Sequence, residues 1–203
     1  MTPAMPPPVI LLASASPRRS ELLRQIGVAH EVRPVDVDES VRPGEAPAAY
    51  VLRLAEAKAE ALWTRLAPEE RRPVLAADTT VALEGVIFGK PADPAEARSM
   101  LSGLAGRTHE VHTAVALRHA GGAAARVSTS SVSLRALAPE ELDWYCRSGE
   151  PDDKAGGYAV QGRAALFIRH IAGSYSGIMG LPLYETWELL APVLGPPAGE
   201  VRP

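Results

Sequence analysis

The stretch Val9-Ile-Leu-Leu-Ala-Ser-Ala-Ser-Pro-Arg-Arg-Ser-Glu-Leu-Leu-Arg-Gln-Ile-Gly27 indicates most directly how this chain folds. Its apolar run, 9–13, lies between prolines and a serine, which predicts a short buried strand. Ser16 and Pro17 then provide an N-cap and a first helical residue, and Gly27 provides a stop. A strand that leads directly into a helix is the building unit of α/β proteins.

The same alternation continues along the chain. We expect further strands at 30–38, 74–83, 86–88, 111–117, 127–137 and 164–171, and helices at 46–66, 94–104, 139–147 and 182–194. Turn signals between neighbouring strands indicate hairpins. This mixture favours an α/β fold with a mixed sheet. Because the sequence has no internal repeat and no long linker, residues 1–203 are predicted to form one domain with frayed ends at about 1–7 and 196–203.

Composition excludes several classes of protein. The chain has 203 residues, of which 46% are hydrophobic and 22% charged, as in soluble globular proteins. A net charge of −3 argues against a partner held through nucleic-acid phosphates. We find no signal peptide and no apolar run of about 18 residues, the length that a membrane span needs. One cysteine, Cys146, excludes internal disulfides and favours a reducing compartment such as the cytoplasm.

Several polar residues lie at the junction between the first expected strand and the first expected helix. Ser14, Ser16, Arg18 and Arg19 lie at this junction. A helix N-terminus presents free N–H groups and the positive end of its dipole, and guanidinium groups add bidentate contacts to an anion. Arginines in a first helical turn can also be ordinary surface residues, but cations are slightly unfavourable there. The junction is therefore a candidate phosphate site.

Carboxylates follow two of the expected strands. Asp78 lies at the end of an apolar run, where α/β sheets keep their ligand crevices. It could bind a divalent cation, orient and deprotonate a water, or simply cap a turn. Glu39, with Asp36 and Asp38, is either a second source of oxygen ligands for a metal or part of a solvated loop.

Lysine is rare, with 3 residues against 18 arginines, so its positions carry information. Lys58, Lys90 and Lys154 place compact ammonium groups where this chain would ordinarily use arginine. Gln161 supplies an amide that can both donate and accept toward a nucleobase. Cations for phosphates, acids for a metal and a water, and an amide for a base together suggest a nucleotide hydrolase.

Three familiar motifs are excluded by their spacing. Residues 85–90 have three residues between the glycines, where a phosphate-binding loop needs four. His109 and His112 do not have the zinc-protease spacing, and three positions apart on a strand they point to opposite faces. Residues 173–177 have tyrosine at the centre, where a nucleophile elbow needs serine.

Nine short segments in order give the chain a resemblance to a known family. They are Leu12-Ala-Ser-Ala-Ser-Pro-Arg-Arg19, Asp38-Glu39, Tyr50-Val-Leu-Arg-Leu-Ala-Glu-Ala-Lys-Ala59, Ala77-Asp-Thr79, Gly89-Lys-Pro91, Gly106-Arg-Thr-His109, Ser148-Gly-Glu-Pro151, Asp153-Lys-Ala-Gly156 and Gly180-Leu-Pro-Leu183. Each is weak alone, but nine in order are strong, and the resemblance runs from about residue 9 to residue 190, nearly the whole chain. The sequence resembles the Maf family of nucleotide pyrophosphatases, also described as septum-formation-inhibitor-like proteins.

The resemblance implies a fold and an activity. The fold would be similar to inosine triphosphate pyrophosphatases, with two lobes around a nucleotide cleft. The activity would be hydrolysis of nucleoside triphosphates to the monophosphate and pyrophosphate with Mg²⁺ or Mn²⁺, in the cytoplasm and as a homodimer.

The resemblance also implies roles for individual residues. Asp78 would be the catalytic base. Arg18, Thr79 and Gln161 would set substrate choice. Ser14, Arg19, Lys58 and Lys90 would bind phosphates, and Glu39 and Asp78 would hold the metal.

Two branches of the family differ at residues that this chain contains. Arg18, Thr79 and the run Lys-Ala-Gly-x-Tyr-x-x-Gln161 resemble the branch that acts on dTTP and UTP. The branch that acts on 7-methyl-GTP has a bulky aromatic residue and Gln at the first two positions. The first branch is therefore expected here. The alternatives are a pyrophosphatase for 7-methyl-GTP or another modified nucleotide, and a non-catalytic, nucleotide-responsive regulator of septation.

Overall fold

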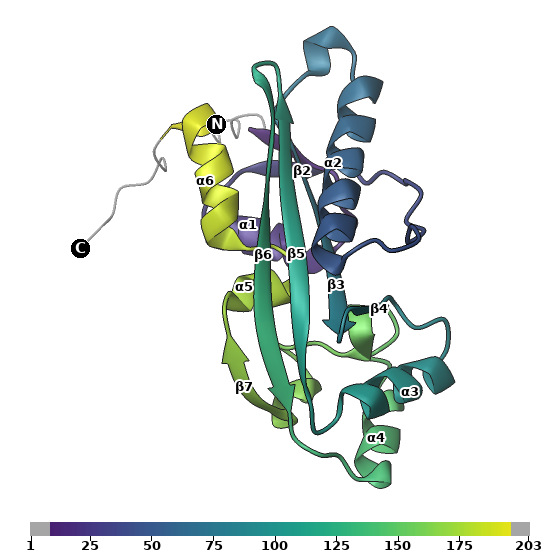
Figure 1. Cartoon of the computed structure of the whole chain (residues 1–203). Coiled ribbons are helices and arrows are strands. Elements are labelled where there is room, and N and C mark those ends of the chain that lie inside the picture. Colours follow the sequence, from purple (N-terminus) through teal and green to yellow (C-terminus); the bar gives the residue numbers. More distant parts are fainter. Residues whose placement is uncertain (1–8, 196–203) are drawn as a thin grey trace, which may run out of the picture.

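A mixed sheet of seven strands organises the molecule (Figure 1). The computed structural model describes residues 9–195. The strands are β1 (Ile10–Leu12), β2 (His30–Val32), β3 (Val74–Leu83), β4 (Val86–Phe88), β5 (Thr108–His119), β6 (Gly122–Leu134) and β7 (Ile168–Ala172). They lie in the order β2-β1-β3-β5-β6-β7, with β4 paired to β3. β1 is parallel to both neighbours and all other pairs are antiparallel, which confirms the expected mixed α/β fold.

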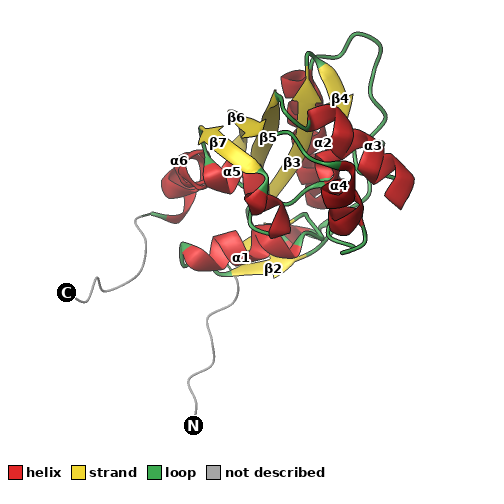
Figure 2. Ribbon diagram, turned by 90° about the horizontal axis from the view of Figure 1, so that it is seen from below, coloured by secondary structure: helices red, strands yellow, loops and turns green. Residues whose placement is uncertain are grey.

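Helices cover both faces of the sheet. They are α1 (Pro17–Gln25), α2 (Pro47–Arg65), α3 (Pro94–Leu104), α4 (Pro139–Cys146), α5 (Tyr175–Met179) and α6 (Leu183–Leu194), with 3₁₀ turns at Pro68–Glu70, Ala155–Gly157 and Arg163–Leu166. Figure 2 shows α6 on one side of the long strands and α2 on the other. Along those strands, α1, α2 and α6 gather toward one end, and α3 and α4 toward the other (Figure 1).

Alternation along β3 determines which side chains enter which core. Leu75 and Ala77 belong to a buried cluster with residues of α1 and α6. Val74 and Ala76 belong to a second cluster with residues of α2. Successive side chains of a strand point to opposite faces, so the pattern extends to the polar residues that follow. Residue 78 therefore lies on the α2 face, and residue 79 on the opposite face.

Several expected boundaries are confirmed and others are wrong. The helix at 94–104 and the strand at 86–88 are found as predicted. The strand expected at 30–38 ends at residue 32, because its partner β1 has only three residues. The strand expected at 127–137 spans 122–134, since pairing continues to the hairpin turn. The strand expected at 164–171 begins with a 3₁₀ turn and becomes β7 only at Ile168.

Two local features also differ from expectation. α5 was not predicted, because five residues are too few for a helical period to show. Ser16 occupies the N-cap position of α1, but its hydroxyl makes no capping hydrogen bond. The frayed ends expected at about 1–7 and 196–203 lie outside the described residues.

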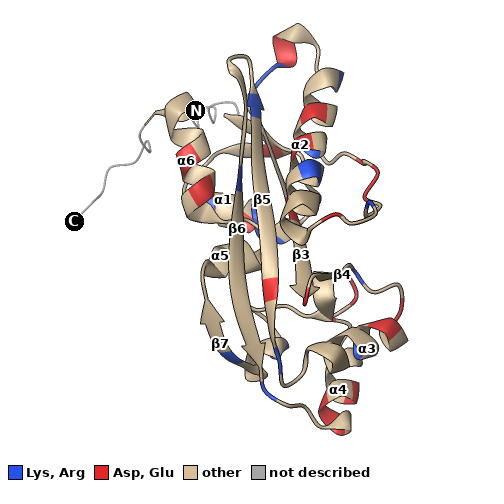
Figure 3. Cartoon of the chain, viewed as in Figure 1, with Lys and Arg blue, Asp and Glu red and all other residues tan. Residues whose placement is uncertain are grey.

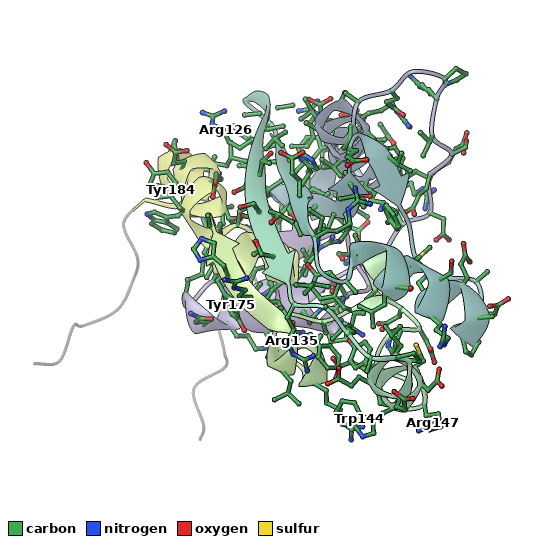
Figure 4. The ribbon with its side chains drawn as sticks, turned by 60° about the horizontal axis from the view of Figure 1, so that its bottom comes forward. Arg126, Arg135, Trp144, Arg147, Tyr175 and Tyr184 are labelled. Atoms are coloured by element: carbon green, nitrogen blue, oxygen red, sulfur yellow. The ribbon has the colours of Figure 1, made fainter. Side chains whose placement is uncertain are left out.

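Charged residues of both signs are interspersed over helices and loops (Figure 3). In Figure 4 the labelled side chains of Trp144, Tyr175 and Tyr184 project outward, and these three are exposed. Within residues 9–195, no helix combines the length and the apolar character needed to cross a membrane.

Candidate active site

A gap in the pairing of β3 defines the site. β1 pairs with Val74 and Leu75 only, and β4 pairs with β3 from Val81 onward. Within the described part of the chain, residues 76–80 therefore have no strand partner on this edge. A cavity of about 620 Å³ lies against this stretch, and its walls come from both ends of the sheet.

The cavity gathers every residue to which the resemblance gives a role, whereas Asp38, which the sequence offered beside Glu39, binds Ser40 and does not line it. Its lining includes Ser14, Arg18, Arg19, Glu39, Lys58, Asp78, Thr79, Lys90 and Gln161. The serine and the arginines come from the β1–α1 junction, Lys58 from α2, and Gln161 from the segment before β7. These side chains therefore surround one space, although they are distributed over most of the sequence. The roles assigned to them remain predictions.

A lysine between two carboxylates forms the ionic part of the site. Lys58 Nζ lies 2.7 Å from Asp78 Oδ1 and 2.6 Å from Glu39 Oε1. Lys58 belongs to the buried face of α2, and Asp78 is only 7% exposed. Burial raises the pKa of the Asp78 carboxyl above its ordinary value, although the charges of Lys58 and Arg19 oppose the shift. A buried carboxylate with a raised pKa is a better proton acceptor than an exposed one.

Glu39 reaches the cavity from the loop that follows β2. The phenol of Tyr50 donates to the main-chain oxygen of Glu39 at 2.9 Å, which ties the loop to α2. Burial disfavours ionisation of Glu39, but the hydrogen bond from Lys58 and the neighbouring positive charges outweigh it and lower the pKa of this carboxyl. Asp78 and Glu39 thus share one ammonium group but have pKa shifts of opposite direction.

Arg19 connects three separate parts of the chain. Its Nε donates to Gly180 O at 2.8 Å, Nη1 to Ser14 Oγ at 3.0 Å and Nη2 to Thr79 Oγ1 at 3.2 Å. Burial lowers the pKa of this guanidinium, and the charge of Asp78 opposes that shift. A guanidinium has five N–H groups, so this arrangement leaves donors for an anion in the cavity.

Arg18 reaches toward the opposite wall. Its Nη1 lies 3.9 Å from Asp153 Oδ2, and Asp153 also pairs with Lys154. Asp153 and Lys154 both line the cavity. They lie within one of the short segments that carry the resemblance, but the sequence did not assign a role to Asp153.

The segment that carries Gln161 is held by two residues that sequence reasoning missed. Tyr145 donates its hydroxyl hydrogen to Glu150 at 2.8 Å and accepts from the Ala159 N–H at 3.2 Å. Glu150 in turn accepts from the Arg163 N–H at 2.9 Å. A Cβ at Gly162 would lie 2.3 Å from a Glu150 oxygen, so a side chain there would displace the Glu150 carboxylate. The only signal in the sequence was the Ser-Gly-Glu-Pro151 segment.

A buried histidine supports the tyrosine on the cavity wall. His109 Nε2 lies 2.7 Å from the hydroxyl of Tyr158, which lines the cavity. Burial lowers the pKa of His109 to about 4, so its imidazole is neutral near pH 7. Burial also raises the pKa of Tyr158, which keeps its hydroxyl protonated. His112 instead contacts Thr129 Oγ1, so the two histidines have different partners.

The chemistry of the donor set is compatible with a divalent cation bound together with a substrate. Among the described residues, no three His, Cys, Asp or Glu side chains are grouped closely enough to hold a metal by themselves. Glu39 and Asp78 nevertheless present carboxylate oxygens at one cavity. Mg²⁺ is usually held by one or two carboxylates that are supplemented by substrate phosphates and water. Two carboxylates therefore fit this manner of binding.

Known proteins are similar to this sequence over almost its full length. A family model described as Maf-like protein matches residues 9–193. The dTTP/UTP pyrophosphatase of Bordetella parapertussis is 54% identical over 195 residues, which cover 93% of this chain and 94% of that protein. The dTTP/UTP pyrophosphatase of Nitrosomonas europaea is 51% identical over 191 residues, with 89% and 92% covered.

Solved structures give a weaker likeness. The Staphylococcus aureus Ham1 protein is 18% identical, with a TM-score of 0.43 over 62% of this chain and 71% of that one. A nucleoside-triphosphatase, dITP/XTP pyrophosphatase, from Mycobacterium abscessus is 20% identical, with a TM-score of 0.41 over 62% and 73%.

Proposed function

Because this chain belongs to the family of Maf-like proteins, we propose that it hydrolyses dTTP and UTP to the monophosphate and pyrophosphate. The observation that carries the chemistry is the buried Asp78 carboxylate, which is hydrogen-bonded to Lys58 on the wall of a cavity lined by side chains of both charges. The preference for dTTP and UTP is supported by relatives of 51–54% identity that are named for these substrates.

The cavity offers balanced charge to a triphosphate. Its cationic lining residues are Arg18, Arg19, Lys58, Lys90 and Lys154, and its carboxylates are Asp36, Glu39, Asp78 and Asp153. The cations position the phosphate chain and stabilise the negative charge that develops on the leaving group. This charge pattern favours a bound anion that carries a counter-cation of its own.

In the proposed reaction, Asp78 orients a water and accepts its proton as the water oxygen attacks the α-phosphorus. The bond between the α-phosphorus and the α–β bridging oxygen breaks, and pyrophosphate leaves. The raised pKa of Asp78 suits it to accept this proton. Arg19 and Lys90 hold the phosphates, while Arg18, Thr79 and Gln161 set the choice of substrate.

Glu39 and Asp78 are the proposed residues for a Mg²⁺ or Mn²⁺ ion, which when bound would neutralise phosphate charge. A cytoplasmic location, a homodimer and a link to cell division are further proposals that rest on the family. The proposal of a homodimer is supported by two exposed aromatic residues, Tyr175 and Tyr184, which lie on the same side of the molecule in Figure 4.

The test is pyrophosphate release by the purified protein with Mg²⁺ or Mn²⁺. The panel contains dTTP, UTP, dCTP, CTP, GTP, ATP and 7-methyl-GTP. We expect the highest kcat/KM for dTTP and UTP and no comparable release by Asp78→Asn. Preference for 7-methyl-GTP would contradict the proposed substrates, and wild-type turnover by a folded Asp78→Asn protein would contradict the proposed base.

A further inference from the structure

The position of Gln161 depends on its main chain. Its side chain is exposed and lines the cavity, and within residues 9–195 it makes no hydrogen bond to the protein. Residues 158–162 belong to no strand and lie between two 3₁₀ turns. A hydrogen bond of 3.0 Å from the Gly162 N–H to the Ala159 carbonyl closes a turn, residues 159–162, that carries Gln161. Whatever holds this turn therefore also places the amide.

One carboxylate anchors both ends of the turn 159–162. After the turn, the Arg163 N–H donates to Glu150 Oε2 at 2.9 Å. At its start, the Ala159 N–H donates to the Tyr145 hydroxyl at 3.2 Å, and that hydroxyl donates to Glu150 Oε1 at 2.8 Å. Glu150 thus holds one end directly and the other through Tyr145.

The three donors around Glu150 require a group that accepts at both oxygens. Oε1 accepts from the Tyr145 hydroxyl and, at 3.4 Å, from the Ala164 N–H, while Oε2 accepts from the Arg163 N–H. These two N–H groups open a 3₁₀ turn, where main-chain donors have no partner within the turn. A carboxylate accepts at both oxygens, but an amide would present its NH₂ group to one of the donors.

The two anchoring residues are held firmly and lie outside the cavity lining. Tyr145 is fully buried, and its ring packs edge-to-face on Phe167 with 5.5 Å between centroids. Burial and the hydrogen bond to Glu150 raise the pKa of the Tyr145 hydroxyl, so it remains a donor. The Glu150 N–H donates to Ser148 Oγ at 3.2 Å. Since neither Tyr145 nor Glu150 lines the cavity, they act on a ligand only through the turn.

We propose that Glu150 is a positioning residue that places the Gln161 amide against the base of the nucleotide. This inference rests on the proposed function, in which Gln161 helps to set the choice of substrate, and it identifies the group that holds Gln161 in place. Loss of this anchor would free the turn 159–162 and weaken the contact with the base. It would leave Asp78 and the cations proposed for the phosphates in place.

The test measures kcat and KM for dTTP in the wild type and two variants. Glu150→Gln turns an amide NH₂ toward one of the donors. Gly162→Ala keeps Glu150, but its Cβ would lie 2.3 Å from Oε1 and so displaces the carboxylate. Gly162 has a φ of −104°, which alanine adopts without strain. Both variants should raise KM about tenfold, as for loss of one hydrogen bond, and keep a kcat close to that of the wild type.

The matched control is Glu141→Gln. Glu141 also accepts from a main-chain N–H, that of Ala138 at 3.0 Å, and pairs with Arg135, but it bonds to no described residue between 158 and 164. This variant should lose stability and keep the wild-type KM.

Titrations with dTMP and with pyrophosphate give a readout that does not depend on turnover. Only dTMP carries the base. Glu150→Gln should therefore weaken binding of dTMP about tenfold and leave binding of pyrophosphate unchanged.

A double variant shows whether Glu150 acts through Gln161. Once Gln161→Ala has removed the amide, adding Glu150→Gln should raise KM no further. If Glu150→Gln does not fold, Tyr145→Phe replaces it, because this change removes one hydroxyl and keeps the ring on Phe167.

The outcomes separate this inference from the proposed function. A wild-type KM in Glu150→Gln, a lower kcat at unchanged KM, or equally weakened binding of dTMP and pyrophosphate would overturn the role of Glu150. A further rise of KM in the double variant would do the same. Wild-type protein that releases no pyrophosphate from dTTP or UTP would instead reject the proposed function, and the titrations would still test Glu150.

Discussion

Asp78 and Thr79 are adjacent in β3, yet their side chains lie on opposite faces of the sheet and meet different surroundings. Asp78 lies on the face covered by α2 and is hydrogen-bonded to Lys58 at 2.7 Å, beside a second carboxylate. Thr79 lies on the face covered by α1 and α5, where its neighbours are a threonine hydroxyl and the Arg19 guanidinium. One strand edge therefore presents an ionic face and a hydroxyl face to the same cavity.

The difference separates two tasks that an enzyme must perform. On the ionic face, burial and nearby charges shift pKa values, which suits the transfer of a proton. On the hydroxyl face, Thr79 accepts hydrogen bonds from Arg19 and Thr113, and directional contacts of this kind suit discrimination between bases. Two neighbouring residues can be tuned independently because the pleat of the strand separates their surroundings.

The largest expected effect compares the two residues directly. Asp78→Asn should lower kcat by about 10²–10⁴ for every substrate, because it removes the general base. Thr79→Val should instead change the dTTP/dCTP ratio by about tenfold through loss of one hydrogen bond. Steady-state kinetics on both nucleotides measures both effects. A change of selectivity in Asp78→Asn as large as that in Thr79→Val would contradict the separation of tasks.

A smaller effect concerns the pH dependence of the ionic face. Asp78 must be ionised to act as a base, and the charge of Lys58 opposes the upward shift of its pKa that burial causes. Lys58→Met should therefore raise that pKa further and move the acid limb of the kcat/KM profile to higher pH. We also expect a fall in kcat on the order of 10² from loss of a charged group at the site.

The matched control for this variant is Lys154→Met. Lys154 also lines the cavity, but it pairs with Asp153 rather than Asp78. The acid limb should keep its wild-type position in this control. An identical shift in both lysine variants would mean that general loss of positive charge, and not the contact with Asp78, sets the limb.

The smallest effect concerns the backbone that supports the hydroxyl face. Gly180 has a φ of +117°, and a Cβ there would lie 3.5 Å from Arg19 Nε and 3.6 Å from Thr79 Oγ1. Gly180→Ala should lower the free energy of unfolding by about 1–3 kcal/mol, because alanine is strained at this φ. It should also raise KM for dTTP without moving the acid limb.

Denaturant unfolding and a pH profile measure both consequences of Gly180→Ala. Gly27→Ala is the control, since Gly27 also has a positive φ but a Cβ there would meet no atom within 4 Å. It should lose stability and keep the wild-type KM. A shift of the acid limb in Gly180→Ala would show that the two faces are coupled.

The sequence predicts best the elements whose ends are set by residues within the element itself. The helix at 94–104 has a proline at its start and a capping aspartate, and both are visible in the sequence. The length of β2 depends instead on how far β1 accompanies it, which is a property of two segments in space. The 3₁₀ turn before β7 is stabilised by Glu150, which lies 13 residues earlier than the N–H of Arg163 that it binds.

The residues of the site also divide into those that the sequence predicted and those that only the fold brings together. Asp78 and Lys58 stood out because a carboxylate after an apolar strand and a rare lysine are unusual locally. Thr113 did not stand out, because a threonine in a strand is ordinary. Its contacts arise from the approach of β3, β5 and α5, which brings two hydroxyls and one carbonyl together. Such a chain of hydrogen bonds has no signature in sequence.

The unpaired edge of β3 has a consequence for how the protein behaves at high concentration. A free strand edge is a template on which another chain can add a strand, and such additions lead to aggregation. Here the free edge spans residues 76–80, roughly 17 Å, and Arg19, Lys58 and Asp78 stand beside it. A second chain could add there only by burying these charges, which is strongly unfavourable. The groups proposed to bind the nucleotide therefore also keep the edge from joining one molecule to another.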